Sequence, residues 1–212
     1  MTADMSAAAV SARGFRQAHV RDVLSDEEIE QILAAVDRCS ATGRRDYAVL
    51  MLAVRYGLRP SDIRQLSLDD LNWREGVITM QQVKTGRPLV LPLLPDVAAA
   101  LIAYLKQGRP ATEERCVFIR HRAPFEPFAP SNNLSAIMRT ALRQAGLDQR
   151  PGRRGLYLFR HSLATRLLAA HCPIKTIGDL LGPVCTDSTR EYATVDLPAL
   201  RRVALSEVEV CP

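Results

Sequence analysis

The chain has 212 residues, of which 47% are hydrophobic and 24% are charged. This composition supports a buried core of ordinary size, and it excludes a largely disordered chain and a fibrous one. The formal net charge is +5, a mildly basic balance that is compatible with a polyanionic partner but does not require one.

No stretch of the sequence approaches the ~20 apolar residues of a membrane span, because the longest apolar run covers only residues 97–105. Residues 1–20 are expected to be a flexible leader. No two cysteines form a CxxC pair, which argues against a zinc site or a disulfide framework. Scattered reduced thiols instead predict a cytoplasmic protein. The five cysteines are Cys39, Cys116, Cys172, Cys185 and Cys211.

The first part of the chain predicts three consecutive helices. Ser25 followed three residues later by Glu28 is a capping box that opens the first helix. A second helix is expected over about residues 44–56, and Gly57 would end it. Pro60 suits the first turn of the third helix, so the segment between them is a tight connection.

After residue 73 the apolar period changes from helical to alternating. Residues 77–80 and 89–91 predict two strands, and the Lys-Thr-Gly-Arg segment 84–87 between them is typical of a turn. The sequence therefore predicts a β-hairpin that carries Lys84 near its tip.

The rest of the chain is predicted to be mainly helical. The expected fold class is mainly α with a small antiparallel β-sheet (α+β). One domain is expected over residues 21–195, followed by a helix and tail at 196–212. The further helices are expected at about residues 96–106, 131–145, 158–170, 174–181, 188–193 and 197–205.

Four local motifs follow one another in an order and spacing typical of a single family. They are Gly-Leu-Arg-Pro-Ser-Asp at 57–62, Lys84 in the hairpin, Tyr-Leu-Phe-Arg-His at 157–161, and Leu-Gly at 181–182 followed by Tyr192. Each motif alone is weak, but their coincidence is specific. Over about residues 20–205 the chain resembles the catalytic domain of tyrosine recombinases, the phage-integrase family, which implies the fold of that domain.

The resemblance implies a site-specific recombinase or integrase that binds double-stranded DNA. Members of this family attack a backbone phosphate with a tyrosine, which leaves a 3′-phosphotyrosyl link and a free 5′-hydroxyl. Because the link conserves the bond energy, neither ATP nor a metal or other cofactor is expected. The absence of a phosphate-binding glycine loop agrees with this expectation.

The resemblance also assigns the catalytic residues. Arg59 and Arg160 would clamp the phosphate, since a guanidinium is always charged and donates in a bidentate fork. Tyr192 would be the nucleophile, and Lys84 would give a proton to the leaving 5′ oxygen. The plainer alternatives are surface salt bridges for the arginines, a core position for the tyrosine and a solvated turn for the lysine.

Two further residues are expected to position the catalytic arginines without touching the phosphate. Asp62 lies one helical turn from Arg59 and would orient it, although a plain acidic residue at a helix start is an equal alternative. His161 would support Arg160, although a purely structural histidine is equally compatible with the sequence.

The sequence departs from the family pattern at two positions. Tyr157 stands where the family motif His-x-x-Arg has histidine, and a phenol transfers protons poorly near neutral pH. Pro183 stands where the family has histidine or tryptophan, so one phosphate hydrogen bond is missing. Loss of one such donor typically costs about 10²–10³ in rate.

Arginines near these motifs are candidate DNA contacts, although charge runs are more often solvated faces. Arg87 would touch the DNA backbone beside the hairpin. Arg120 and Arg122 belong to one basic cluster, with Arg115 and His121. Another cluster leads into the Tyr157 motif and includes Arg153 and Arg154.

Several readings stay open at this stage. One alternative is a catalytically weakened or inactive DNA-binding relative, and another is a type IB topoisomerase, which shares the chemistry. A helical module unrelated to nucleic acid is a further possibility. The helix expected at 197–205 is a candidate for self-association on DNA, and the alternative is that it folds back on its own domain. Family members normally carry another N-terminal domain, so the chain is either a catalytic fragment or a short recombinase.

Overall fold

The computed structural model describes residues 23–152 and 154–181. The expected leader and the helices expected after residue 181 lie outside the described residues. In chain order the elements are α1 (Asp26–Ala34), α2 (Ala41–Tyr56), α3 (Pro60–Gln65), the 3₁₀ helix η1 (Leu68–Asp70), β1 (Leu71–Asn72), β2 (Val77–Gln81), β3 (Pro88–Pro92), α4 (Pro95–Gln107), α5 (Ser135–Gln144), α6 (Tyr157–Ala169) and α7 (Ile174–Leu181).

The fold class predicted from the sequence is confirmed, with small shifts at the ends of elements. The capping box of Ser25 and Glu28 is present at the start of α1. Helix α2 begins earlier than expected because the Ser40 hydroxyl accepts a hydrogen bond from the Gly43 amide and caps it. Strand β1 was missed because two residues are too few to show an alternating pattern.

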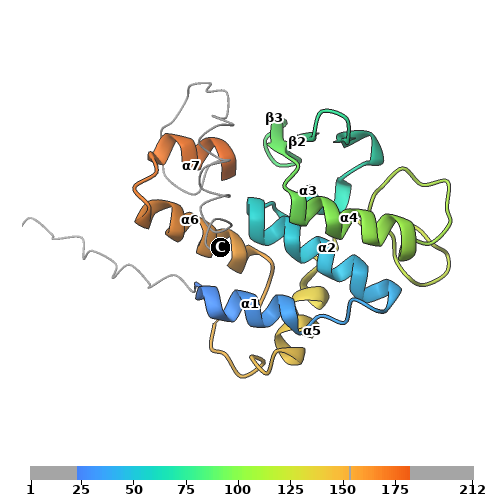
Figure 1. Ribbon diagram of the computed structural model, residues 1–212, viewed down its shortest axis with the longest axis horizontal. Helices are drawn as coiled ribbons and strands as arrows, with labels where there is room; N and C mark the ends of the chain where they lie inside the picture. Colours follow the sequence, from blue (N-terminus) through green and yellow to red (C-terminus); the bar gives the residue numbers. More distant parts are fainter. Residues whose placement is uncertain (1–22, 153, 182–212) are drawn as a thin grey trace, which may run out of the picture.

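Helix α2 runs through the middle of the molecule. It packs against α4 on one side and against α6 on another, while α1 and α5 lie below it in the view of Figure 1. Val49, Leu50 and Leu52 of α2 have no exposed surface, so this helix forms the centre of the core. Within residues 23–152 and 154–181, no helix combines the length and apolarity that crossing a membrane requires.

The three strands form an antiparallel sheet in the order β1–β2–β3. The paired residues Ile78 and Leu91 are both buried on the inner face of the sheet. The Tyr56 hydroxyl, at the end of α2, donates to the Pro92 carbonyl oxygen (2.6 Å) and accepts from the Leu94 amide (3.1 Å). These bonds fix the β2–β3 hairpin beside the C-terminal end of α2.

Gly57 ends α2 in the left-handed conformation, with φ 61° and ψ 28°. It also lies where two other helices approach. A Cβ atom on Gly57 would stand 2.7 Å from Cδ2 of Leu181 and 3.2 Å from Cδ2 of Leu163, and 3.6 Å from the Arg160 Cα atom. The missing side chain therefore allows α6 and α7 to pack directly on the end of α2.

We predict that Gly57→Ala destabilises the fold more than Gly76→Ala. Both glycines have positive φ values, of 61° and 66°, but a Cβ at Gly76 would meet nothing within 4 Å. The left-handed conformation costs about 1–2 kcal/mol for alanine, and overpacking against the two leucines adds about 1–3 kcal/mol at Gly57 only. Urea unfolding of the two variants measures the difference, and equal losses would contradict the packing role.

Candidate active site

Arg59 lies in the short connection between α2 and α3, where Pro60 begins the next helix. Arg59 is only 4% exposed. The Nη1 atom stands 3.9 Å from Oδ2 of Asp62, which is an ion pair beyond hydrogen-bond length. Among the described residues this buried Nη1 has no hydrogen-bond partner, so its donor capacity is available for an anion.

Arg160 lies on α6 and is 6% exposed. Its Nη1 donates a hydrogen bond of 2.9 Å to the Gly57 carbonyl oxygen. The segment that carries Arg59 thus also holds Arg160, although the two arginines are a hundred residues apart in the sequence. Sequence reasoning missed this contact because a backbone carbonyl carries no sequence signal.

The two guanidinium groups influence one another electrostatically. Burial, and after it the Arg59 cation, lowers the pKa of Arg160 to about 10, while Asp62 and Tyr157 act in the opposite direction. A pKa of about 10 keeps Arg160 charged at neutral pH. Arg59 and Arg160 are thus two buried cations at one place, and buried cations favour the binding of an anion.

Asp62 is 1% exposed, and its two carboxylate oxygens face different partners. Oδ1 accepts a hydrogen bond of 2.9 Å from the backbone amide of Val83 in the hairpin turn, whereas Oδ2 faces Arg59 at 3.9 Å. The carboxylate thus contacts the hairpin as well as the arginine. Lys84, the next residue after Val83, has an exposed side chain.

The turn between β2 and β3 is held by its own hydrogen bonds. Gln82, which is 4% exposed, accepts at its carbonyl oxygen from the Gly86 amide (2.8 Å) and donates its amide to the Arg87 carbonyl oxygen (2.9 Å). Its side-chain oxygen accepts from the Thr85 hydroxyl at 2.8 Å. The loop around Lys84 is therefore a defined turn, and Arg87 is exposed within it.

Tyr157 begins α6 and is 45% exposed. It precedes Arg160 by three residues, which places both on one side of the helix, and it acts to raise the pKa of Arg160. His161 follows on the same helix and is half-buried. The position that is histidine in the family motif is thus beside the arginines here also.

Some predicted site residues cannot be placed. Tyr192, Pro183 and Arg153 lie outside the described residues. Among the described tyrosines, burial raises the pKa of Tyr56 and of Tyr104, and the hydroxyls of both hold backbone groups. Those two phenols are therefore structural.

The predicted DNA contacts separate into two regions. Arg154 is exposed shortly before α6, close in sequence to the site. Arg120 and Arg122 belong to a loop at the other end of α2, where His121 meets Thr42 (3.3 Å). Thr42 and the end of α2 at Gly57 are separated by about 22 Å at the helical rise of 1.5 Å per residue.

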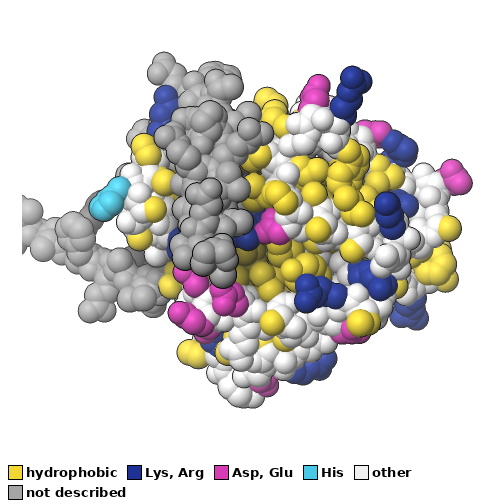
Figure 2. Space-filling view, in the orientation of Figure 1, with side chains coloured by type: hydrophobic (Ala, Val, Ile, Leu, Met, Phe, Trp, Pro, Cys, Tyr) yellow, Lys and Arg dark blue, Asp and Glu magenta, His cyan; other side chains and the backbone are white. Residues whose placement is uncertain are grey.

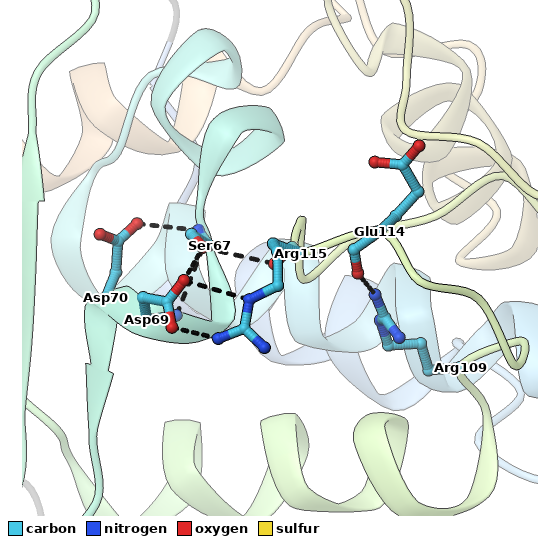
Figure 3. Close-up of polar contacts among 6 residues, drawn as sticks. All are labelled: Ser67, Asp69, Asp70, Arg109, Glu114 and Arg115. Atoms are coloured by element: carbon cyan, nitrogen blue, oxygen red, sulfur yellow. Dashed lines mark hydrogen bonds and ion pairs between the residues drawn. The ribbon is translucent and has the colours of Figure 1, made fainter.

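Several arginines of the second region are engaged by protein groups. Arg120 pairs with Glu126 at 2.5 Å. Figure 3 shows Arg115 paired with Asp69, beside the turn at Ser67, and Arg109 donating to the Glu114 carbonyl oxygen. Figure 2 shows basic side chains dispersed over the visible face, with acidic and apolar ones between them. Arg109, Arg115 and Arg120 thus each have a protein partner.

Within the part of the chain that the structure describes, no group of three or more histidine, cysteine, aspartate or glutamate side chains is arranged to hold a metal ion. The charged groups that converge at the end of α2 are instead arginines and one aspartate. Their arrangement suits the binding of an anionic phosphate group.

Comparison with known proteins identifies relatives of this chain. The model of the phage integrase family matches residues 22–197. The putative integrase/recombinase y4gC of Sinorhizobium fredii (strain NBRC 101917 / NGR234) is 39% identical over 86% of this chain and 94% of its own length.

Two solved structures share the fold. The XerH site-specific recombinase bound to palindromic difH substrate superposes with a TM-score of 0.64 at 21% identity, covering 88% of this chain. A lambda integrase tetramer bound to a Holliday junction gives 0.53 at 19% identity over 83% of this chain. The chain spans about half of each of these chains, 53% and 49%.

The converging arginines, the helical domain with its small sheet, the family model and y4gC lead to one assignment. This chain belongs to the phage integrase family, the tyrosine-type site-specific recombinases.

Proposed function

We propose that this chain cleaves and rejoins double-stranded DNA at specific sites through a 3′-phosphotyrosyl intermediate, acting in the cytoplasm. The observation that carries the proposal is the juxtaposition of buried Arg59 and Arg160 at Gly57, with an Arg59 donor that has no hydrogen-bond partner among the described residues. A diester phosphate has one negative charge and two non-bridging oxygens, which match two guanidinium groups.

In the proposed reaction Tyr192 gives its phenol proton to solvent water, and the phenolate oxygen attacks phosphorus and forms the new O–P bond. The bond from phosphorus to the 5′ oxygen breaks, and this oxygen takes a proton from Lys84. Arg59 and Arg160 stabilise the charge that gathers on the non-bridging oxygens. Rejoining is the reverse reaction with a partner's 5′-hydroxyl, so no external energy source enters.

Tyr157 is proposed to donate a hydrogen bond to the phosphate or to the nucleophile, in place of the usual histidine. His161 is proposed to support Arg160 from the same helix. Because a phenol is a poor proton carrier near neutral pH and Pro183 offers no donor, we expect slow chemistry. Because the expected activity is weak, a direct assay is needed to distinguish an active recombinase from the inactive DNA-binding alternative.

Contacts to DNA are proposed for the exposed arginines nearest the site, Arg87 and Arg154, together with Arg153. Arg120 and Arg122, at the far end of α2, would touch DNA only along an extended interface. Self-association on DNA through residues 196–212 is proposed as well. This proposal is supported by the lambda integrase structure, which is a tetramer bound to a Holliday junction.

We predict that the full chain forms a covalent adduct with DNA and that Tyr192→Phe abolishes it. The probe is a library of duplexes with randomised arms and a nick beside one fixed linkage, so that cleavage releases a short fragment and traps the protein. Adducts are recovered after denaturation and sequenced. Tyr157→Phe is the matched control, because it removes the exposed phenol beside Arg160 and should slow adduct formation without preventing it.

No adduct from the parent chain, under conditions in which a control recombinase reacts, would favour the inactive alternative. An adduct that survives Tyr192→Phe and disappears with Tyr157→Phe would reassign the nucleophile. Relaxation of supercoiled plasmid without a preferred sequence would favour the topoisomerase alternative.

We predict that sulfate stabilises the folded chain through Arg59. An anion bound with a dissociation constant a hundredfold below its concentration adds about 2.7 kcal/mol to the free energy of unfolding. Thermal unfolding in sulfate against chloride, at equal ionic strength, measures the gain. Arg59→Gln should lose most of it. Arg64→Gln is the matched control, since Arg64 is equally buried on α3 but donates to the Asn132 carbonyl oxygen at 2.7 Å. Equal gains in both variants would contradict a phosphate site.

We predict that Lys84→Ala slows cleavage of an ordinary substrate by about 10²–10⁴-fold, the range of general-acid catalysis. A substrate in which sulfur replaces the bridging 5′ oxygen should restore the rate, because a thiol has a pKa near 8.5 and leaves without a proton. Both substrates have a DNA sequence that the adduct selection recovers. If the sulfur substrate is equally slow, Lys84 has another role.

A further inference from the structure

Asp62 connects two parts of the proposed site that come from different segments. It lies on α3, one turn after Arg59, and it is the least exposed charged residue in the site, at 1%. Its two oxygens face different partners. Oδ1 accepts from the Val83 amide at 2.9 Å, and Oδ2 faces Nη1 of Arg59 at 3.9 Å.

The shorter of these contacts goes to the hairpin. A hydrogen bond from a backbone amide to an ionised carboxylate is about twice as strong as one between neutral groups. The distance to Arg59 exceeds hydrogen-bond length, so that interaction is purely coulombic. Asp62 is therefore bonded to the turn before Lys84 and only electrostatically linked to the arginine.

The conformation of the turn is set by its own hydrogen bonds, but its position against α3 requires a further contact. The bonds of Gln82 to Gly86, Arg87 and Thr85 set its conformation. None of those bonds uses the Val83 amide, which is directed to Asp62. The bond to Asp62 consequently fixes where the preformed turn lies against α3.

Lys84 follows Val83 directly, so the Cα atoms of the two residues are about 3.8 Å apart. The lysine side chain is exposed and has four rotatable bonds, and its ammonium can reach a leaving oxygen only if its backbone is correctly placed. A displacement of about 1 Å can cost about 10²-fold in rate.

From these contacts we propose that Asp62 is a positioning residue for Lys84: its carboxylate sets the distance between the proton donor and the arginine clamp. This inference rests on the proposed function, and it assigns Asp62 a task other than orienting Arg59. The proton still passes from Lys84 to the 5′ oxygen, and Asp62 exchanges none.

The experiment compares cleavage of the oxygen and the 5′-sulfur substrates by the full chain. The ratio of the two rates reports the step that Lys84 serves, and a merely structural loss would slow both substrates equally. Asp62→Ala should raise the sulfur-to-oxygen ratio by about 10–100-fold. Asp62→Asn retains an oxygen that can accept from the Val83 amide, so its ratio should stay near that of the parent chain.

Asp46→Ala is the matched control. Asp46 is a half-buried carboxylate near the start of α2 that pairs with Arg45 at 2.7 Å, at the opposite end of the helix from Gly57. Its loss should lower stability without changing the ratio. Circular dichroism and the sulfate response of each variant verify that the fold and the arginine clamp persist.

The outcomes separate the two levels of the argument. If Lys84→Ala shows the raised ratio and Asp62→Ala does not, Asp62 acts on Arg59 or on stability, and this inference is overturned while the proposed function stands. If the parent chain cleaves neither substrate, the proposed function itself fails. A raised ratio in Asp62→Asn as large as in Asp62→Ala would also contradict a role based on the hydrogen bond to Val83.

Discussion

The hydrogen bond from Arg160 to the Gly57 carbonyl oxygen is the contact on which the site depends. It forms because Gly57 has no side chain to keep α6 and α7 away and because its left-handed conformation turns the chain sharply after α2. Through this one carbonyl, α6 is placed against the segment that carries Arg59. The site is therefore assembled from distant segments at Gly57, where α6 and α7 pack against the backbone.

Burying two arginines together is unfavourable in itself, and the depressed pKa of Arg160 expresses that cost. Asp62 lies beside Arg59, and the two guanidinium groups together have the donor geometry that suits a phosphate diester. In the proposed reaction this preorganised pair of arginines would stabilise the transition state without reorganisation, as electrostatic catalysis requires.

The rest of the basic surface is organised differently. Arg115 and Arg120 are engaged by acidic side chains of the protein, and Arg109 by backbone carbonyls. Ion pairs of this kind are weakly stabilising when exposed, but they lower the charge that is available to DNA. At the end of α2, by contrast, Arg59 has a donor atom with no hydrogen-bond partner among the described residues.

Local sequence signals determined much of the fold. The capping box at Ser25, the glycine that ends α2, Pro60 at the start of α3 and the hairpin around Lys84 are each encoded within a few residues, and each was predicted from them. The family resemblance likewise depends on short motifs, so the sequence alone is enough to identify the residues of the candidate site. Local patterns reach that far because capping, turn formation and helix termination are decided by neighbours in the chain.

Tertiary structure decided what those residues do to one another. The bond of Asp62 to the Val83 amide, the bond of Arg160 to Gly57 and the pairing of Arg115 with Asp69 all join distant segments, and two of them use backbone groups that every residue possesses. No pattern in the sequence predicts such partners. They are set by the packing of α2, α3, α6 and the hairpin, because only packing determines which buried polar groups come within hydrogen-bond distance.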